Sequence, residues 1–208
     1  MKSIAAAFMF CSFVVTADMA HAQDRLPPIP PDKMTAEQKK AVDEFVSARN
    51  APLSGPFIPM LRSPEVMTRA RAMGDFLRYK SSLPPRLSEF VILMTARQWT
   101  QQYEWNTHYD IAIKAGVKVE VAKAIAEGRR PEGLAEDEQV LYDFCSELQH
   151  NRSVTDATYA RMLSKFGETS IIDTAGIVGY YSFLAIMLNT ARTPADPSSA
   201  PILTPLPR

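Results

Sequence analysis

The chain has 208 residues, of which 46% are hydrophobic, and its 23 basic residues are matched by 23 acidic ones. This balance gives no electrostatic reason for binding nucleic acid or an anionic membrane surface, and the hydrophobic content is not that of a disordered chain. The length suits one domain with a sizeable core.

Residues 1–22 have the pattern of a secretory signal peptide. Lys2 supplies a positive charge, residues 4–15 form an apolar stretch too short to anchor in a bilayer, and Ala20-His21-Ala22 has the small-x-small form of a cleavage site. A buried N-terminal helix is the alternative, but it gives no reason for this order of features. We therefore expect cleavage after Ala22, export to the periplasm or the outside of the cell, and no membrane association of the mature protein.

The cysteines exclude one kind of chemistry. Cys11 leaves with the signal peptide, so the mature chain keeps only Cys145 and forms no internal disulfide. Dithiol redox chemistry within one chain is therefore excluded.

The mature chain begins with an extended arm followed by a helix. Residues 23–34 contain four prolines, which hold the segment extended and deny it helix hydrogen bonds. Thr35 is typical of a helix N-cap, with Gln38 three residues on as its capping-box partner. This helix is expected to end near Arg49.

A loop and a second helix come next. Glycine and proline break residues 52–59, and the apolar side chains of this loop are expected to fold over the core or line a pocket entrance. Ser63 as N-cap and Pro64 at the first helical position then begin a helix that reaches about Lys80.

The central part of the chain shows apolar residues at helical spacing. The predicted helices cover residues 86–98, 101–115, 118–127, 135–149 and 155–166. Gly116 and Gly167 are placed to end the second and the last of these. Cys145 falls on the apolar stripe of its helix and is expected in the core.

Residues 171–188 are apolar almost all round, so a membrane span is one interpretation. Asp173 interrupts the stretch, and small residues such as Gly176 and Gly179 suit close helix packing, which favours a buried core helix or a subunit interface. The Pro-rich tail, residues 193–208, is expected to wrap a neighbour or to stay mobile.

No strand-like alternation appears anywhere in the chain. Residues 35–192 are therefore predicted to form one all-α domain.

One helix carries a candidate acid–base pair. His108 follows Glu104 by four residues, so the two side chains lie on one helical face, and Ile111 and Ala115 make the rest of that face apolar. The pair is thus expected to point inward, where a carboxylate beside an imidazole fixes its tautomer and suits proton shuttling. The alternative is a buried ion pair that only joins two helices. His150, at the end of a helix, is expected to interact with the helix dipole.

The segments around this pair resemble a known family. Arg86-Leu87-Ser88-Glu89, Tyr103-Glu104-Trp105-Asn106-Thr107-His108 and Ala115-Gly116-Val117 are similar to the carboxymuconolactone decarboxylase family, which includes the AhpD-type alkylhydroperoxidases. The peroxidase branch has a Glu, a Cys-x-x-Cys twelve residues on, and a His four residues after the second Cys. Glu89 and His108 match the Glu and the His. Gln101 and Glu104 occupy the two cysteine positions.

The resemblance implies an AhpD-like helical bundle that assembles as a homo-oligomer. Peroxide reduction is not expected, because neither Gln101 nor Glu104 can be oxidised and re-reduced as a thiol can. What remains resembles the decarboxylase side, so we expect a lyase or related proton-transfer enzyme that needs neither cofactor nor metal. Its substrate would be a small carboxylated molecule or lactone.

Roles for individual residues follow from this expectation. His108 would donate the proton, Glu104 would orient it, and Glu89 would be a second proton carrier or a hydrogen-bond partner of the substrate. The predicted substrate-binding residues are Arg97, Gln101, Tyr103 and Trp105. Arg86 is a second candidate to hold a carboxylate, and for either arginine a salt bridge at the surface or between helices is the alternative.

Two further hypotheses compete with the lyase. Glu89, Glu104 and His108 form a possible metal-ligand set, because residues four apart on one helix commonly chelate. The other hypothesis is a non-catalytic binding protein in which Trp99, Tyr103 and Trp105 form the walls of a ligand pocket. Against a literal carboxymuconolactone decarboxylase stands the predicted export, because aromatic-ring catabolism of that kind is generally intracellular.

Overall fold

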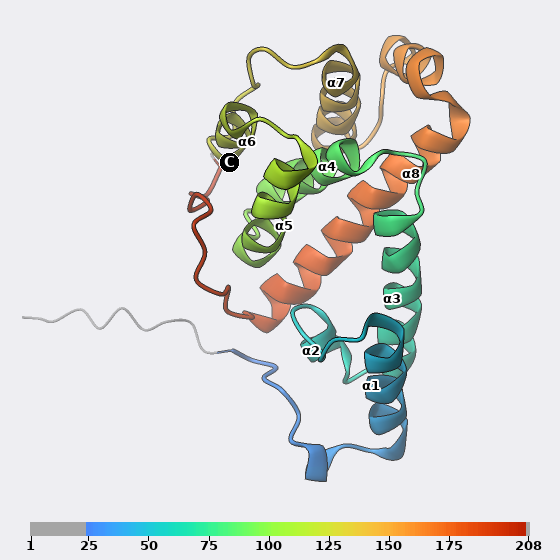
Figure 1. Cartoon of the computed structure of the whole chain (residues 1–208), viewed down its shortest axis with the longest axis vertical. Coiled ribbons are helices and arrows are strands. Elements are labelled where there is room, and N and C mark those ends of the chain that lie inside the picture. The colour runs from blue at the N-terminus through green and yellow to red at the C-terminus, as the bar shows by residue number, and fades with distance from the viewer. Residues whose placement is uncertain (1–23, 207–208) are drawn as a thin grey trace, which may run out of the picture.

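A computed structural model describes residues 24–206, and the predicted signal peptide, residues 1–22, lies outside them. The described residues form helices and no strand, which confirms the all-α prediction (Figure 1). The elements are η1 (Pro31–Lys33), α1 (Ala36–Arg49), α2 (Phe57–Met60), α3 (Pro64–Tyr79), α4 (Pro85–Gln98), α5 (Gln102–Ala115), α6 (Val119–Ala126), α7 (Glu136–Asn151) and α8 (Asp156–Ala191).

The helix ends follow local rules with one exception. The Thr35 hydroxyl accepts from the backbone N–H of Gln38 at 3.2 Å and the Gln38 side chain accepts from the backbone N–H of Thr35 at 3.0 Å, so the predicted capping box is confirmed. Gly116 ends α5 in the left-handed conformation, with φ 107°. Ser63 occupies the predicted N-cap position of α3, but its φ of −129° and ψ of 83° depart from the extended cap conformation and its side chain makes no cap hydrogen bond. Pro64 does begin α3.

Helix α4 is the centre of the fold. All of its residues from Leu87 to Arg97 are buried, and it contacts α3, α5, α6, α7 and α8. A helix enclosed on every side cannot follow the usual apolar stripe, so its polar residues must find partners in the core. Glu89 and Arg97 are among these buried polar residues.

Helix α8 crosses the molecule and bends at Gly167 (Figure 1). Gly167 has φ 79° and ψ 173°, so the predicted break between residues 155–166 and 171–188 is confirmed, although the two segments form one continuous element. Among the described residues α8 is the helix long and apolar enough to cross a membrane, and 56% of its apolar window is buried inside the protein. Contacts with α3, α4 and α7 account for this burial, as expected of a core helix.

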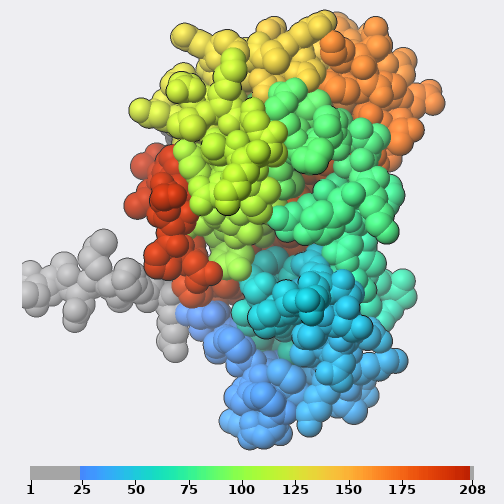
Figure 2. All heavy atoms as spheres, viewed as in Figure 1, coloured from blue at the N-terminus to red at the C-terminus, as the bar shows by residue number. Residues whose placement is uncertain are grey.

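The C-terminal tail runs along its own domain. The red atoms of the tail lie against the yellow-green atoms of α5 (Figure 2). Gln102 accepts from the backbone N–H of Leu203 at 2.8 Å, and Asn106 donates to the carbonyl of Asp196 at 2.7 Å. The tail up to residue 206 therefore packs on α5, whereas the sequence predicted that it would wrap a neighbour or stay mobile. The extended prolines leave their carbonyls free for such side-chain donors.

Two helical glycines test the packing of α3 against α8. A Cβ at Gly74 would lie 2.1 Å from the hydroxyl oxygen of Tyr180, whereas a Cβ at Gly179 would meet no heavy atom within 4 Å. We expect Gly74→Ala to lower the free energy of unfolding by about 1–3 kcal/mol through overpacking. Gly179→Ala, the matched control, should raise it by about 0.5–1 kcal/mol through helix propensity. Urea denaturation measures both, and equal effects at the two positions would contradict this packing.

Candidate functional site

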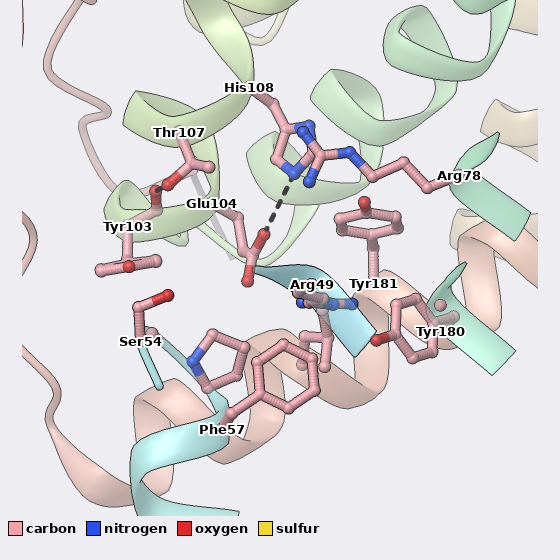
Figure 3. Close-up of a pocket in the computed structure, with 14 residues that line it drawn as sticks. Arg49, Ser54, Phe57, Arg78, Tyr103, Glu104, Thr107, His108, Tyr180 and Tyr181 are labelled. Carbon is pink, nitrogen blue, oxygen red and sulfur yellow. Dashed lines mark hydrogen bonds and ion pairs between the residues drawn. The ribbon is translucent and has the colours of Figure 1, made fainter. Parts of the chain in front are cut away.

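The candidate site forms where α5 faces α3, α8 and the loop before α2 (Figure 3). Helix α5 carries Glu104 and His108, α4 supplies Glu89 behind them, and α3 supplies Arg78. Spacing of four residues places Glu104 and His108 on one face of α5, and both are buried, as their apolar surroundings predicted.

Glu89 holds the imidazole of His108. The Nδ1 atom of His108 lies 2.6 Å from Oε2 of Glu89, and both side chains are almost fully buried. Nδ1–H donates to the carboxylate, so Nε2 is the ring nitrogen left to face Glu104. Nε2 lies 3.6 Å from Oε2 of Glu104. Glu89 thus lies at Nδ1 of His108 and Glu104 at Nε2, whereas the sequence led us to expect Glu104 as the partner that orients the ring.

Glu104 is a buried carboxyl group with an unused oxygen. Its Oε1 atom is buried and has no hydrogen-bond partner. Burial raises the pKa of Glu104, the positive charges of His108 and Arg78 oppose this shift, and the negative charge of Glu89 adds to it. Burial therefore shifts this carboxyl group toward its protonated form. In Figure 3 this carboxyl group points away from the α5 backbone into the space between His108 and Phe57.

A cavity of about 100 Å³ lies in front of Glu104 and His108. Its lining residues come from α1, the loop before α2, and helices α2, α3, α5 and α8, and comprise Arg49, Ser54, Gly55, Pro56, Phe57, Gly74, Arg78, Tyr103, Glu104, Thr107, His108, Tyr180, Tyr181 and Leu184. The apolar loop thus lines the pocket, which is one of the two roles predicted for it. This volume is smaller than that of a cavity of about 150 Å³ that admits benzene, so it limits the ligand to a small molecule.

Two arginines bring positive charge to the cavity. Nε of Arg78 lies 3.8 Å from Oε1 of Glu89. Arg49 donates to Oδ1 of Asp75 from Nη2 at 2.8 Å and from Nε at 3.0 Å, and its guanidinium lies 4.6 Å from the ring centre of Phe57. Asp75 also accepts from Arg71 at 2.7 Å. With Glu104 protonated, the arginines around the cavity outnumber the carboxylates, so the site favours an anion.

Two tyrosines of α8 close the cavity beside the histidine. The rings of His108 and Tyr181 lie 5.1 Å apart and perpendicular, as do those of Tyr180 and Tyr181 at 5.4 Å. Burial raises the pKa of both tyrosines, and the positive charges of Arg49 and Arg78 only partly oppose this shift. Their hydroxyl groups therefore stay protonated and can donate hydrogen bonds.

The structure divides the predicted substrate-binding residues. Tyr103 lines the cavity beside Gly55, and burial raises its pKa, with Asp196 and Glu104 adding to the shift. Trp105 is fully buried with its ring 5.9 Å from that of Tyr109, and it does not line the cavity.

Gln101 and the two candidate arginines also lie outside this cavity. Gln101 caps α5 by accepting from the backbone N–H of Tyr103 at 2.7 Å, and it donates to Asn189 of α8 at 2.7 Å. Arg86 binds Asp137 and Glu138 of α7, each at 2.5 Å, which is the inter-helix salt bridge considered for it. Arg97 lines a separate cavity beside α6 and α7.

The sequence did not point to Arg49, Arg78, Tyr180 or Tyr181 as residues of the cavity. The two arginines carry no local signal, because arginine near the end of a helix is ordinary on a surface. The adjacent tyrosines did interrupt an apolar helix, and buried hydroxyl groups require partners. That interruption was a signal for the site.

The metal hypothesis has no geometric support in the described chain. Among residues 24–206, no group of three or more His, Cys, Asp or Glu side chains is placed to hold a metal ion. Glu89 and Glu104 face opposite nitrogens of the His108 ring, so they cannot converge with it on one ion.

Comparison with known proteins defines the fold. No protein-family model matches the chain, and no curated protein matches it. An AhpD-core, uncharacterized peroxidase-related protein from Ralstonia eutropha JMP134 superposes with a TM-score of 0.66 at 17% identity, over 83% of this chain and 92% of that one. A peroxidase-related protein from Silicibacter sp. TM1040 gives a TM-score of 0.63 at 14% identity, over 80% and 87%.

The third structure is a Cys-to-Ala variant of the debrominase Bmp8 in complex with 2,3,4-tribromopyrrole. It superposes with a TM-score of 0.64 at 12% identity, over 82% of this chain and 91% of that one. The protein therefore has the all-helical AhpD-like fold, as the resemblance of its central segment predicted.

The raised pKa of Glu104 makes stability depend on pH. Between the ordinary value of 4.5 and the raised folded-state value, the folded protein keeps a proton that the unfolded chain has released. The stabilisation is full below the ordinary value, and each pH unit through this window removes about 1.4 kcal/mol. We expect Glu104→Gln to abolish this slope in urea denaturation measured from pH 4 to pH 8. Glu120→Gln on the surface is the control, and an unchanged slope in Glu104→Gln would contradict the assignment.

Proposed function

We propose that the protein is a cofactor-independent proton-transfer enzyme of the lyase type that acts on a small carboxylated or lactone substrate. One observation carries this proposal. The carboxyl group of Glu104 is buried, keeps one oxygen without a partner, and lies between the cavity and Nε2 of His108. A group in this position can give a proton to a bound molecule and recover one from the imidazole.

The proposed proton path runs from His108 to Glu104 to the substrate. Glu104 is the general acid, because burial favours its protonated form. His108 returns a proton from solvent to Glu104, and Glu89 stabilises the imidazolium that this return requires. In this proposal His108 therefore reprotonates Glu104, and Glu89 orients the imidazole of His108.

A decarboxylation in this site balances as follows. The bond between the carboxyl carbon of the substrate and its neighbouring carbon breaks, carbon dioxide leaves, and the electron pair moves into an adjacent carbonyl of the substrate. Glu104 then protonates the carbon that lost the carboxyl group, and a solvent proton restores Glu104 through His108.

The charge around the cavity supports an anionic substrate. Arg49 and Arg78 line the cavity, and Arg71 lies nearby. The two negative charges of Asp75 and Glu89 only partly balance the three positive charges of these arginines. A carboxylate placed between the two arginines would be held by charge-assisted hydrogen bonds. The cavity volume of about 100 Å³ limits the substrate to a small molecule. The debrominase of the same fold, in complex with a brominated pyrrole, supports a small ring as one candidate.

Thiol-dependent peroxide reduction does not fit these residues. Gln101 and Glu104 stand where the resembling peroxidases have cysteines. Cys145 is buried in the core away from the cavity, and burial raises the pKa of its thiol. The thiolate that peroxide chemistry needs is thus disfavoured.

We also propose that the protein is exported and forms a homo-oligomer. Residues 1–22 support export, and apolar side chains exposed on α3 and α8 support assembly. They comprise Val66, Met73 and Phe76 on α3 and Ile172 and Ile186 on α8.

The lyase proposal is tested by turnover of a panel of small oxo acids and lactones. Carbon dioxide release and deuterium incorporation from heavy water, followed by NMR, report both steps. We expect His108→Asn and Glu104→Gln each to lower kcat/KM at least about 100-fold, because each removes a proton-transfer group. His150→Asn, at an exposed histidine, should leave turnover unchanged. Binding without turnover in the unsubstituted protein, kept in His108→Asn, would instead support a non-catalytic binding protein.

A second measurement separates this protein from thiol peroxidases. Incubated with tert-butyl hydroperoxide and a dithiol, the protein should consume no peroxide above the buffer rate. Cys145→Ala should behave in the same way, because the thiol lies outside the site. Peroxide turnover that Cys145→Ala abolishes would contradict the proposal.

A further inference from the structure

A second cavity, of about 300 Å³, lies at the C-terminal end of α4. Residues of α4, α6, α7 and the tail line it, and they share no member with the cavity beside His108. In Figure 1 the red end of the tail runs beside α6 at this place. The volume falls at the lower end of the range typical of small-molecule sites.

A buried arginine that has an unsatisfied donor is among the residues that line this cavity. Arg97 is only 4% exposed, and its Nε atom is buried without a hydrogen-bond partner. Nη1 donates to the hydroxyl of Thr100 at 3.3 Å, and no carboxylate of residues 24–206 forms an ion pair with the guanidinium. Burial lowers the pKa of Arg97. A buried charge without a counter-charge is costly, so the position calls for an anion.

The other residues that line the cavity indicate what the rest of the ligand would be. Met94, Tyr142 and Leu206 supply apolar surface. Arg129 adds a second cation at the rim, where its Nε donates to Glu127 at 2.5 Å. An anionic group at Arg97 with an apolar body against the other walls would satisfy both parts of the cavity.

We infer that this second cavity binds a small monocarboxylate with an apolar or aromatic body, and that Arg97 holds the carboxylate. The planar guanidinium presents parallel donors that match the two oxygens of a carboxylate. The inference is independent of the function proposed for Glu104 and His108, because the two cavities lie apart. It also relocates the carboxylate-binding role predicted for Arg97 from the acid–base site to a site of its own.

Benzoate is the probe, and benzamide is its uncharged control. Isothermal titration calorimetry on the full chain should show benzoate binding that benzamide does not reproduce. Arg97→Met, which keeps side-chain length and removes the charge, should weaken this binding at least about tenfold. Arg69→Met, at an arginine on the surface of α3 outside both cavities, should leave it intact. Equal binding of benzoate and benzamide, or unchanged benzoate binding in Arg97→Met, would overturn the inference.

Crystals of the unsubstituted protein provide a test that does not depend on the folding of a variant. After a soak in 4-bromobenzoate, anomalous density for bromine should lie between Met94 and Tyr142, with the carboxylate at Arg97. Bromine only beside His108, or water alone at Nε of Arg97, would overturn the inference. The position of the bromine does not depend on turnover in the lyase assay. The carboxylate site at Arg97 and the lyase activity at Glu104 and His108 can therefore be disproved independently.

Discussion

The hydrogen bond between Glu89 and His108 sets the geometry of the candidate site. Glu89 lies on α4, which is buried over its whole central part, so its carboxylate needs a partner inside the protein. His108 on α5 is that partner, at 2.6 Å. This hydrogen bond joins α4 and α5 at the site and constrains the position of His108 relative to Glu89. It also directs Nε2 of the imidazole toward Glu104 and the cavity.

Segments far apart in the sequence complete the cavity around this bond. Asp75 of α3 accepts hydrogen bonds from Arg49 of α1. Tyr180 of α8 occupies the space that a side chain at Gly74 would fill. These contacts place cations and tyrosine hydroxyls opposite Glu104. Because each wall comes from a different element, the chemistry of the site depends on the packing of the whole bundle.

Each of the two cavities discussed above is lined by a residue that has a buried polar atom without a partner. Glu104, with its Oε1 atom, lines the cavity of about 100 Å³, and Arg97, with its Nε atom, lines the cavity of about 300 Å³. One is a carboxyl group favoured in its protonated form, and the other is a guanidinium without a counter-ion. Native proteins rarely leave such groups unsatisfied, so each is a position where a bound molecule would complete the hydrogen bonding.

Local sequence determined the helical class and most of the helix ends. The Thr35–Gln38 capping box and the bends at Gly116 and Gly167 depend only on neighbouring residues, so they were predictable. The shared face of Glu104 and His108 follows in the same way from four-residue spacing on one helix. Ser63 lies at the predicted N-cap position but makes no cap hydrogen bond, because its backbone does not adopt the extended cap conformation.

Only the tertiary structure decided how the site works. Spacing along the chain could not show which carboxyl group touches which nitrogen of His108, and the structure gives Glu89 the orienting position. The structure also shows that Arg97 lines a different cavity and that Arg78 lies beside Glu89 in the acid–base cluster. The physical reason is that these contacts join different helices. Their geometry is set by the packing of side chains around α4, which no single segment of the sequence contains.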